Sequence, residues 1–333
     1  MSSIDVIVPC YRYAHYLRQC VESVLDQEGV DVRVLILDDA SPDHTPEVGQ
    51  ALAREDKRVT YVRHAVNKKH IATYNEGIDW ISADYYLLLS ADDYLLPGAL
   101  ARAAALLDAR PDVGFVFGNA NELQEDGTES RMDTFGDGSG DRVVSGEEFI
   151  EINWPYNAVP TPTAVVRTSL QKEVGGYRPE LPHAGDMEMW MRLAARAPVG
   201  MIDAAQAVYR RHASNMSYAY FRQSRLPDLE QRQLVAEGFL ASSGPLLRDP
   251  EGLRRRMFRA LSLGAVGYAS SAFNDGDLDL SERFTKAARS LYPGVWRTLP
   301  WAKLRFKRLF GQKVWRAMQP AAEVLRLAAG RRR

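Results

Sequence analysis

Two pairs of adjacent acidic residues are candidates for chemistry, because each pair comes at or just after the end of an apolar run. They are Asp38-Asp39, after Val32–Leu37, and Asp92-Asp93, after Tyr85–Leu89. Like charges placed side by side are costly unless a partner neutralises them. A divalent cation would do so, and Mg²⁺ or Mn²⁺ typically takes one or two carboxylates together with substrate phosphates. The acid pairs therefore indicate a metal-dependent site.

Each acid also has a simpler interpretation as a structural residue. An aspartate after a strand is often a turn former or a helix N-cap. This alternative is strongest for Asp93, which precedes the helical pattern Leu95–Leu106. It is weaker for two pairs that end separate buried strands.

The elements that position these acids are predicted to alternate between strand and helix. Short apolar or β-branched runs predict strands at Asp5–Pro9, Val32–Leu37, Val59–Val62 and Tyr85–Leu89. Strands separated by helices imply right-handed crossovers and a mainly parallel, Rossmann-like sheet of the α/β class. Such sheets bind ligands at the carboxyl ends of their strands. Both acid pairs and the segment around Tyr11 would meet at that edge.

Six ordered motifs give the chain a resemblance to the family-2 inverting glycosyltransferases. They are Val6–Tyr11, Leu35–Asp43, Asn67–Gly77, Leu87–Pro97, Gly185–Leu193 and Val208–His212. The resemblance covers roughly residues 3–217 and implies a GT-A fold that binds a nucleotide sugar. We therefore expect a catalytic domain over residues 1–218 and an all-α extension over residues 219–333.

The resemblance also implies which residues contact the nucleotide. Pro9 would be a nucleotide-binding residue, Tyr11 would lie against the base, and Asp39 would accept a hydrogen bond from a uracil-type ring nitrogen. Asp38 would be a structural or ribose-side neighbour. Lys69 stands where the family often has glycine, so it would contact phosphate or ribose, or else belong to a solvated turn.

The metal site implied by the resemblance is an altered Asp-x-Asp motif. Ser90 occupies the first acidic position, so Asp92 is the expected ligand of Mn²⁺ or Mg²⁺ and also a nucleotide contact. Asp93 would support the metal or orient the sugar. His212 would complete the metal shell, and an imidazole ligand suits Mn²⁺ better than Mg²⁺. The alternative for His212 is a surface loop residue.

A transferred sugar needs a base that removes the proton of the acceptor hydroxyl. The resemblance assigns this role to Asp186, at the start of an apolar helical pattern, where an N-cap is the alternative. Arg210 and Arg211 would hold the donor diphosphate. Ser217 belongs to a segment with the composition of a lid over the donor. Trp154–Pro162 would be an acceptor wall or a rigid connection.

The C-terminal third is predicted to be helical and basic. Leu253–Phe273 and Leu278–Leu291 predict a helical hairpin, which packs on the catalytic domain or mediates a homo-oligomer. Trp301–Met318 predicts an amphipathic helix with an apolar stripe that includes Phe306, Leu309, Phe310 and Val314, and with Lys303, Lys307, Arg308 and Lys313 on its other faces. Trp301 and Trp315 are added as candidates for an interfacial position. Such a helix favours an anionic membrane surface, with docking on its own protein as the alternative.

Charge is divided unevenly along the chain. The net charge of the 333 residues is −1, but residues 301–333 hold ten basic residues and one acid, which leaves residues 1–300 with a net charge of −10. No nucleic-acid motif accompanies the basic tail, so nucleic acid is not an expected partner. Two cysteines without a metal-type spacing exclude a disulfide framework or zinc finger. No signal peptide is predicted, so we expect a cytoplasmic protein that is peripheral at the inner face of the membrane.

The sequence thus predicts a metal-dependent inverting glycosyltransferase of the hexosyl type. It would move a sugar, most simply from a UDP-sugar, to a hydroxyl of a glycan or lipid-linked saccharide in cell-surface polysaccharide synthesis. A sugar-nucleotide nucleotidyltransferase could share the sheet and the acids. A non-catalytic, membrane-associated glycan- or nucleotide-binding module is the other alternative, because Ser90 replaces a carboxylate.

Overall fold

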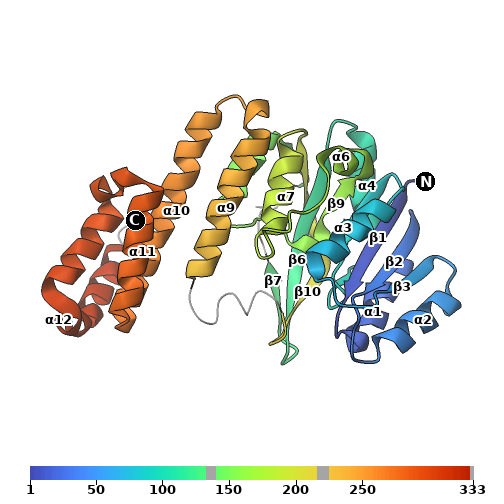
Figure 1. The fold of residues 1–333 in the computed structure, drawn as a ribbon, viewed down its shortest axis with the longest axis horizontal. Helices are drawn as coiled ribbons and strands as arrows, with labels where there is room; N and C mark the ends of the chain where they lie inside the picture. Colours follow the sequence, from blue (N-terminus) through green and yellow to red (C-terminus); the bar gives the residue numbers. More distant parts are fainter. Residues whose placement is uncertain (133–139, 216–224, 331–333) are drawn as a thin grey trace. The chain divides into compact units, whose positions relative to one another are not determined.

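The computed structural model describes residues 1–132, 140–215 and 225–330, with side chains as far as residue 315. The chain forms two compact units, shown in Figure 1. The first comprises Met1–Ala219 and Ala241–Arg248, and the second comprises Tyr220–Leu240 and Asp249–Arg333. The division into a catalytic domain and a helical extension at residue 218 stays a prediction, and the contacts add that a short later segment belongs with the first unit.

One mixed sheet organises the described part of the first unit. Its strand order is β3-β2-β1-β4-β9-β6-β10-β5, with β7 paired to β6 and β8 paired to β10. The pairs β1-β2, β2-β3, β1-β4 and β6-β10 are parallel, whereas β9 is antiparallel to both β4 and β6. The strands are β1 Ser3–Cys10, β2 Asp31–Asp38, β3 Val59–Arg63, β4 Tyr85–Leu88, β5 Tyr94–Leu95, β6 Phe115–Gln124, β7 Glu129–Met132, β8 Arg142–Val144, β9 Val165–Arg167 and β10 Val199–Arg211. The predicted α/β fold with a mainly parallel sheet is confirmed.

Helices cover both faces of this sheet. Val6 and Val8 of β1 belong to a core shared with Leu17 of α1. Ile7 points to the other face, toward α3, where a Cβ atom on Gly77 would come within 2.4 Å of Ile7 Cγ2. Helix α3 can therefore lie this close to β1 only with glycine at position 77. The helices of this unit are α1 Ala14–Leu25, α2 Thr45–Glu55, α3 His70–Trp80, α4 Ala99–Ala109, α5 Gly146–Ile152, α6 Thr168–Val174 and α7 Gly185–Ala194, with the 3₁₀ turns η1 Thr161–Thr163 and η2 Gly244–Leu246.

Aromatic packing anchors α7, the helix whose first turn carries Asp186. Trp190 of α7 is buried and stacks on Phe115 of β6, with ring centroids 5.6 Å apart. Phe149 of α5 meets Phe115 edge-on at 5.3 Å. Offset and edge-to-face aromatic contacts of this kind add to the stabilisation from burial alone. The start of α7 is thereby fixed beside the sheet.

The second unit is helical in its described residues. The predicted hairpin is present: Gly276, with φ at +93°, ends its first helix, and the Asp277 carboxylate caps the second by accepting a hydrogen bond from the Leu280 N–H. The last helix is interrupted at Gly311, where φ is +73°. The elements are α9 Leu226–Ser243, whose last three residues are counted with the first unit, α10 Pro250–Asp275, α11 Leu278–Leu291, η3 Pro293–Arg297 and α12 Leu299–Gly330.

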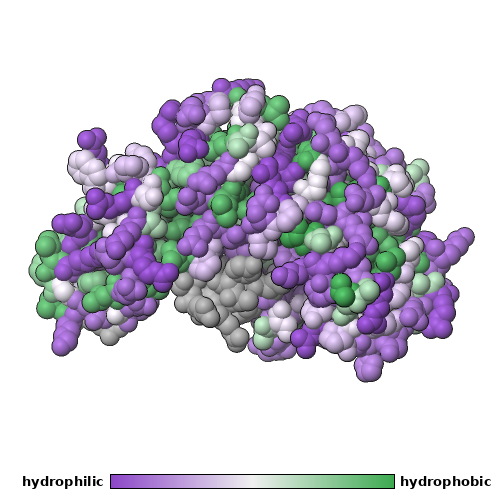
Figure 2. All heavy atoms as spheres, viewed as in Figure 1, coloured by the Kyte–Doolittle hydropathy of each residue, from purple (hydrophilic) through white to green (hydrophobic). Residues whose placement is uncertain are grey.

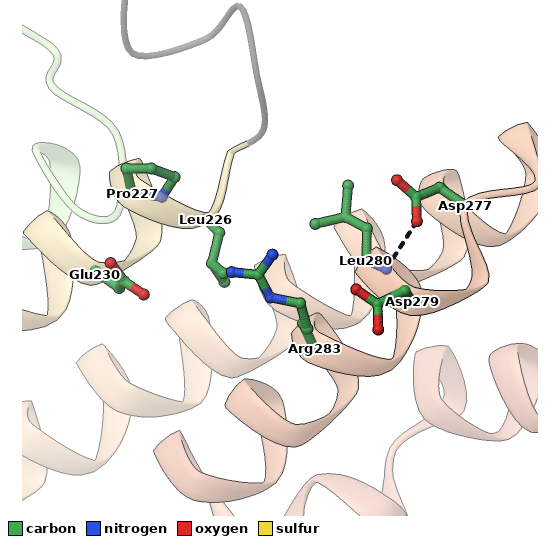
Figure 3. A pocket seen from close by; sticks show the side chains of 7 residues that line it. All are labelled: Leu226, Pro227, Glu230, Asp277, Asp279, Leu280 and Arg283. Carbon is green, nitrogen blue, oxygen red and sulfur yellow. Dashed lines mark hydrogen bonds between the residues drawn. The ribbon is translucent and has the colours of Figure 1, made fainter.

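Three further features of the described residues bear on function. A pocket of about 340 Å³ in the second unit contains none of the residues predicted to do chemistry, and it is lined by Leu226, Pro227, Glu230, Asp277, Asp279, Leu280 and Arg283 (Figure 3). Within the described ranges, no helix is sufficiently long and apolar to cross a membrane. Both cysteines are free and buried.

Candidate active site

The two acids at the end of β2 have different environments. Asp38 is fully buried, and its carboxylate accepts hydrogen bonds from the Ser41 N–H at 2.8 Å and from the Tyr61 hydroxyl at 2.7 Å. These bonds hold the turn that follows the strand. A structural role for Asp38 agrees with this geometry, and its contact with a ribose stays a prediction.

Asp39 instead organises the loop that leads into α3. Its Oδ1 accepts from the Lys68 N–H at 2.7 Å, and its Oδ2 accepts from the Lys69 N–H at 2.9 Å. His64 Nδ1 lies 2.8 Å from Oδ1. An ionised carboxylate offers about four lone-pair positions. Three neighbours therefore leave one lone-pair position of Asp39 for a further donor. The ring N–H of a bound base could occupy it, and that base contact stays a prediction.

Backbone strain gathers around the same loops. The described residues that combine a side chain with a positive φ are Arg12 at +67°, Ala40 at +57° and Lys69 at +69°. Arg12 and Ala40 follow β1 and β2, and Lys69 precedes α3. Such conformations persist where surrounding contacts over-determine the backbone, which is common at ligand sites. The carboxyl edge of the sheet is the place where this chain holds them.

Lys69 explains why glycine is frequent at this position in the family. Its φ of +69° and ψ of +159° fall in a region that only glycine adopts easily. We expect Lys69→Gly to raise the free energy of unfolding by about 1 kcal/mol, because relief of about 1–3 kcal/mol of strain exceeds the added entropy of the unfolded chain. Denaturant titration of Lys69→Gly beside Lys68→Gly measures this. Lys68 has no positive φ, so its substitution should destabilise, and an equal response of the two variants would contradict the strain.

The end of β1 is joined to the segment that carries the second acid pair. The Pro9 carbonyl accepts a hydrogen bond from the Ala91 N–H at 3.3 Å. Tyr11 follows with 41% of its surface exposed. An exposed aromatic ring at the carboxyl edge can stack on a base, so this geometry is compatible with the roles predicted for Pro9 and Tyr11, which stay predictions.

Asp92 and His212 are brought together from positions 120 residues apart. Asp92 Oδ2 lies 3.1 Å from His212 Nε2 and 3.3 Å from Asn215 Nδ2, and all three residues are buried. Tyr13 packs edge-on against the His212 ring at 5.5 Å. His212 is therefore not a surface residue of a loose loop. Within the described residues, no three His, Cys, Asp or Glu side chains are grouped so as to hold a metal by themselves.

Asp93 faces the protein interior and does not cap the next helix. Helix α4 begins at Ala99 with Gly98 as its N-cap, so the alternative of a cap at Asp93 is wrong. Asp93 Oδ1 accepts from the Arg210 N–H at 2.9 Å, which fixes the end of β10. Burial, followed by the charge of Asp92, raises the pKa of Asp93 well above its ordinary value. Its part in a metal shell stays a prediction.

Arg210 and Arg211, which the sequence assigns to the donor diphosphate, both bind other groups of the protein. The Arg210 guanidinium lies over the rings of Tyr16 and Tyr94 and donates to the Asp92 carbonyl and to Gln19. Arg211 forms an ion pair with Glu122. A diphosphate contact would need either side chain to exchange these partners, and both assignments stay predictions. Ser217 lies outside the described residues.

Asp186 lies in the first turn of α7 without capping it. The N-cap position is Ala184, and no side-chain cap bond is made there. The Thr161 hydroxyl donates to Asp186 Oδ2 at 3.1 Å, so the segment Trp154–Pro162 ends against this carboxylate. Burial raises the pKa of Asp186 above its ordinary value. A raised pKa brings a carboxylate closer to the range in which it can accept a proton efficiently.

Asn75 positions the loop that leads to Asp186. Its side chain donates to the Tyr177 carbonyl at 2.9 Å and accepts from the Tyr177 N–H at 2.6 Å. His70, from the start of the same helix, binds the Pro182 carbonyl through Nε2 at 2.8 Å. The motif Asn67–Gly77 therefore connects the Asp39 side of the site with the Asp186 side.

Two tyrosines are affected by the charges of both the predicted metal motif and the expected base. Burial and the negative charges of Asp93, Asp92 and Asp186 together raise the pKa of Tyr209 to about 12. Burial and the charges of Asp186 and Asp92 likewise raise the pKa of Tyr74. Both rings thus lie within electrostatic reach of acids that are 94 residues apart in the chain. Motifs from β4, α7 and β10 converge on one region.

The sequence did not single out two of the residues that complete this region. Asn215 donates to Asp92, and its only signal was its place three residues after His212. His64 contacts Asp39 from the end of β3, and its signal was the strand before it. A histidine that ends a parallel strand belongs to the same edge as the acids.

A mainly parallel sheet with acid pairs at its carboxyl edge, and with a half-buried acid on a flanking helix, is the arrangement that a GT-A fold predicts. The family model described as "Glycosyl transferase family 2" matches residues 5–172, which is half of the chain. The chain belongs to this family and is a glycosyltransferase.

The chain is also similar to curated proteins and to solved structures. An uncharacterized protein of Mycobacterium tuberculosis is 24% identical over 70% of this chain and 74% of its own length. The Campylobacter jejuni GalNAc(5)-diNAcBac-PP-undecaprenol beta-1,3-glucosyltransferase is 32% identical, but over only 36% of this chain and 38% of its own. The fold is similar to that of residues 1–349 of TarS from S. aureus in complex with UDP-GlcNAc, with a TM-score of 0.65, 19% identity and coverage of 96% of this chain and 92% of that one.

Proposed function

We propose that this glycosyltransferase moves a sugar from a nucleotide donor to a hydroxyl acceptor with inversion at the anomeric carbon. The observation that carries the proposal is the contact between Asp92 and His212. Asp186 would belong to the same region, because its charge and that of Asp92 both act on Tyr74 and Tyr209. One part of this region can hold the donor phosphates, while the other presents a carboxylate to an acceptor.

The residues present fit a divalent cation. Asp92 and His212 offer one oxygen and one nitrogen ligand, a donor pair that suits Mn²⁺ better than Mg²⁺. Because two protein ligands do not fill a shell, the donor phosphates and water would supply the rest, as is usual for these ions. Asp93 would then support Asp92 in the metal shell. When bound, the cation stabilises the negative charge that develops on the departing diphosphate.

Asp186 would take the acceptor proton during a single displacement. The acceptor oxygen forms a bond to C1 of the sugar as its proton passes to the Asp186 carboxylate. The bond between C1 and the phosphate oxygen breaks, and the nucleoside diphosphate leaves with the electron pair. The Thr161 hydroxyl, bonded to Asp186 Oδ2, leaves the other carboxylate oxygen for the acceptor.

A uridine nucleotide is the donor that the Asp39 environment favours. The Asp39 carboxylate has an acceptor position in excess of its three protein contacts, which suits the ring N–H of uracil. Tyr11 would stack on the base and Lys69 would lie near phosphate or ribose. The similar structure of TarS contains UDP-GlcNAc, which supports the same donor class here.

For the acceptor we propose a hydroxyl of a glycan or lipid-linked saccharide in cell-surface polysaccharide synthesis. The name of the Campylobacter relative describes a lipid-linked acceptor, which supports this class. An enzyme with such an acceptor would work in the cytoplasm, at the inner face of the membrane. The helical unit is available for pairing with a second copy of the chain.

The two alternative functions, a sugar-nucleotide nucleotidyltransferase and a non-catalytic binding module, have less support. Family membership favours glycosyl transfer over nucleotidyl transfer, which would release pyrophosphate from a nucleoside triphosphate. A binding module without catalysis would not need the half-buried acid Asp186, whose charged form is disfavoured by partial removal from water.

A thermal-shift screen of nucleotide sugars tests the donor class. We expect UDP-sugars with Mn²⁺ to raise the melting temperature, because a ligand that binds only the folded state stabilises it by about 2.7 kcal/mol at 100 times its Kd. The same nucleotides with a chelator should shift it less, and GDP- or CMP-sugars serve as the comparison. A larger shift with another base than with uracil would overturn the uridine assignment.

A further inference from the structure

Helix α12 packs on its own unit through a partly basic face. Trp301 and Leu304 are buried. Lys307 donates to the Ser270 hydroxyl at 2.6 Å, and Arg308 donates to the hydroxyls of Ser281 and Thr285 at 2.8 Å. This face of the helix therefore docks on its own unit, and an interfacial position for Trp301 is wrong. These cations point inward because α10 and α11 offer them hydroxyl and amide oxygens.

Before the interruption at Gly311, the side of α12 opposite Lys307 and Arg308 presents apolar side chains to solvent, and Val314 is exposed just after the interruption. We call the residues Phe306, Leu309, Phe310 and Val314 the apolar stripe. Their exposed fractions are 51%, 79%, 43% and 49%. The rings of Phe306 and Phe310 pair at 4.7 Å, so they form one surface. Figure 2 shows apolar residues, in green, at the end of the helical unit where α12 lies.

Exposed cations border the apolar stripe, and the stretch of α12 up to residue 315 contains no acid. Lys303, Arg305 and Lys313 are exposed, and residues 299–315 contain no Asp or Glu. Residues 316–333 add five arginines and one glutamate in the sequence. Apolar side chains bordered by Lys and Arg fit the boundary between acyl chains and anionic headgroups.

We propose that the apolar stripe docks on an anionic lipid surface. Phe306, Leu309, Phe310 and Val314 would enter the boundary of the acyl chains, while Lys303, Arg305 and Lys313 bind lipid phosphates. This contact deepens the proposed function, because it would hold the enzyme beside a lipid-linked acceptor. Only that benefit rests on the proposed function, and the lipid contact itself does not.

Charge distinguishes this partner from a second copy of the chain. A two-fold interface places the same patch on both sides of the contact. Pairing through the apolar stripe would therefore bring Lys303, Arg305 and Lys313 close to the same set of cations on the other copy, and like charges disfavour that contact. A lipid surface with negative headgroups reverses the sign of this interaction.

Vesicle flotation of the full chain, without donor or acceptor, tests the proposal separately from catalysis. The vesicles are phosphatidylcholine alone or with about one third phosphatidylglycerol, which supplies the anionic headgroups. We expect binding only to the anionic vesicles. Replacing Leu309 with Ser should lower the partition coefficient about tenfold. Replacing Lys303 with Ser should lower it about fivefold, an effect that high salt removes.

Matched variants keep the test specific. Leu278→Ser removes a leucine that is 55% exposed in α11, and Lys57→Ser removes an exposed lysine of the first unit. Both should bind vesicles as the unaltered chain does. Equal losses in Leu309→Ser and Leu278→Ser would overturn the proposal. So would a dimer in light scattering that Leu309→Ser dissociates while vesicle binding is unchanged, because a second copy would then cover the apolar stripe. If the unaltered chain bound the anionic vesicles but transferred no sugar, the proposed function would be overturned and the lipid contact would stand.

Discussion

Asp186→Asn is expected to lower the rate of sugar transfer by about 10²–10⁴-fold, because removal of the general base leaves the acceptor proton without a positioned carboxylate. The amide keeps the size of the side chain and can still contact the Thr161 hydroxyl, which binds Asp186 at 3.1 Å. Donor affinity should therefore change little. Rates under saturating donor, together with a donor titration by calorimetry, separate the two effects.

The same substitution should make the folded protein more stable at neutral pH. Burial raises the pKa of Asp186 above its ordinary value of 3.8, so the folded state holds the proton more tightly than the unfolded state. Stability linked to this group is greatest below pH 3.8 and falls as the pH rises through the raised pKa of the folded state. Asp186→Asn removes that loss. Asp79→Asn, which changes an exposed acid of α3, is the control. Full activity in Asp186→Asn would exclude this residue as the base.

Asp92→Asn is expected to lower kcat/KM by about 10³-fold, since loss of several kcal/mol of charge stabilisation on the leaving diphosphate has an effect of this size. Unlike Asp186→Asn, it should also weaken donor binding in the presence of Mn²⁺. The binding of Mn²⁺ itself, followed by electron paramagnetic resonance of the free ion, should weaken in parallel.

A partner variant and a control complete the Asp92 experiment. His212→Gln should lower kcat/KM and the binding of Mn²⁺ less than Asp92→Asn does. The two residues should act together, because His212 Nε2 lies 3.1 Å from Asp92 Oδ2. Asp126→Asn, an exposed acid in the turn between β6 and β7, should behave as the unaltered chain does. An Asp92→Asn enzyme with unchanged dependence on Mn²⁺ would place the cation elsewhere.

The first half of the fold could be predicted because its signals are local. The β-branched runs that became β1, β2 and β3 and the apolar run that became β4 each end near a polar residue, and parallel strands bring such ends to one edge. The contact of His212 with Asp92 was harder to predict, since it depends on the register of β10 beside β6 and on the turn that Asn215 closes by accepting from the His212 N–H. The order of the sequence motifs predicted that Asp92 and His212 act together, whereas hydrophobic periodicity did not.

Side-chain partners account for what the sequence could not predict. Lys307 and Arg308 look solvated in a helical projection, but the hydroxyls of Ser270, Ser281 and Thr285 attract them inward. The strain at Lys69 was likewise hidden, because Asp39 fixes that backbone through a hydrogen bond from another loop. Long-range polar contacts of this kind leave no periodic pattern in a sequence.

Product analysis with a UDP-sugar and Mn²⁺ tests the central claim most directly. Nuclear magnetic resonance of the reaction follows the nucleotide by phosphorus and the sugar by its anomeric proton, with water or an added saccharide as acceptor. The account predicts release of UDP with inversion at C1, loss of that release on chelation, and none in Asp186→Asn. Release of pyrophosphate from a nucleoside triphosphate, or transfer with retained configuration, would contradict it.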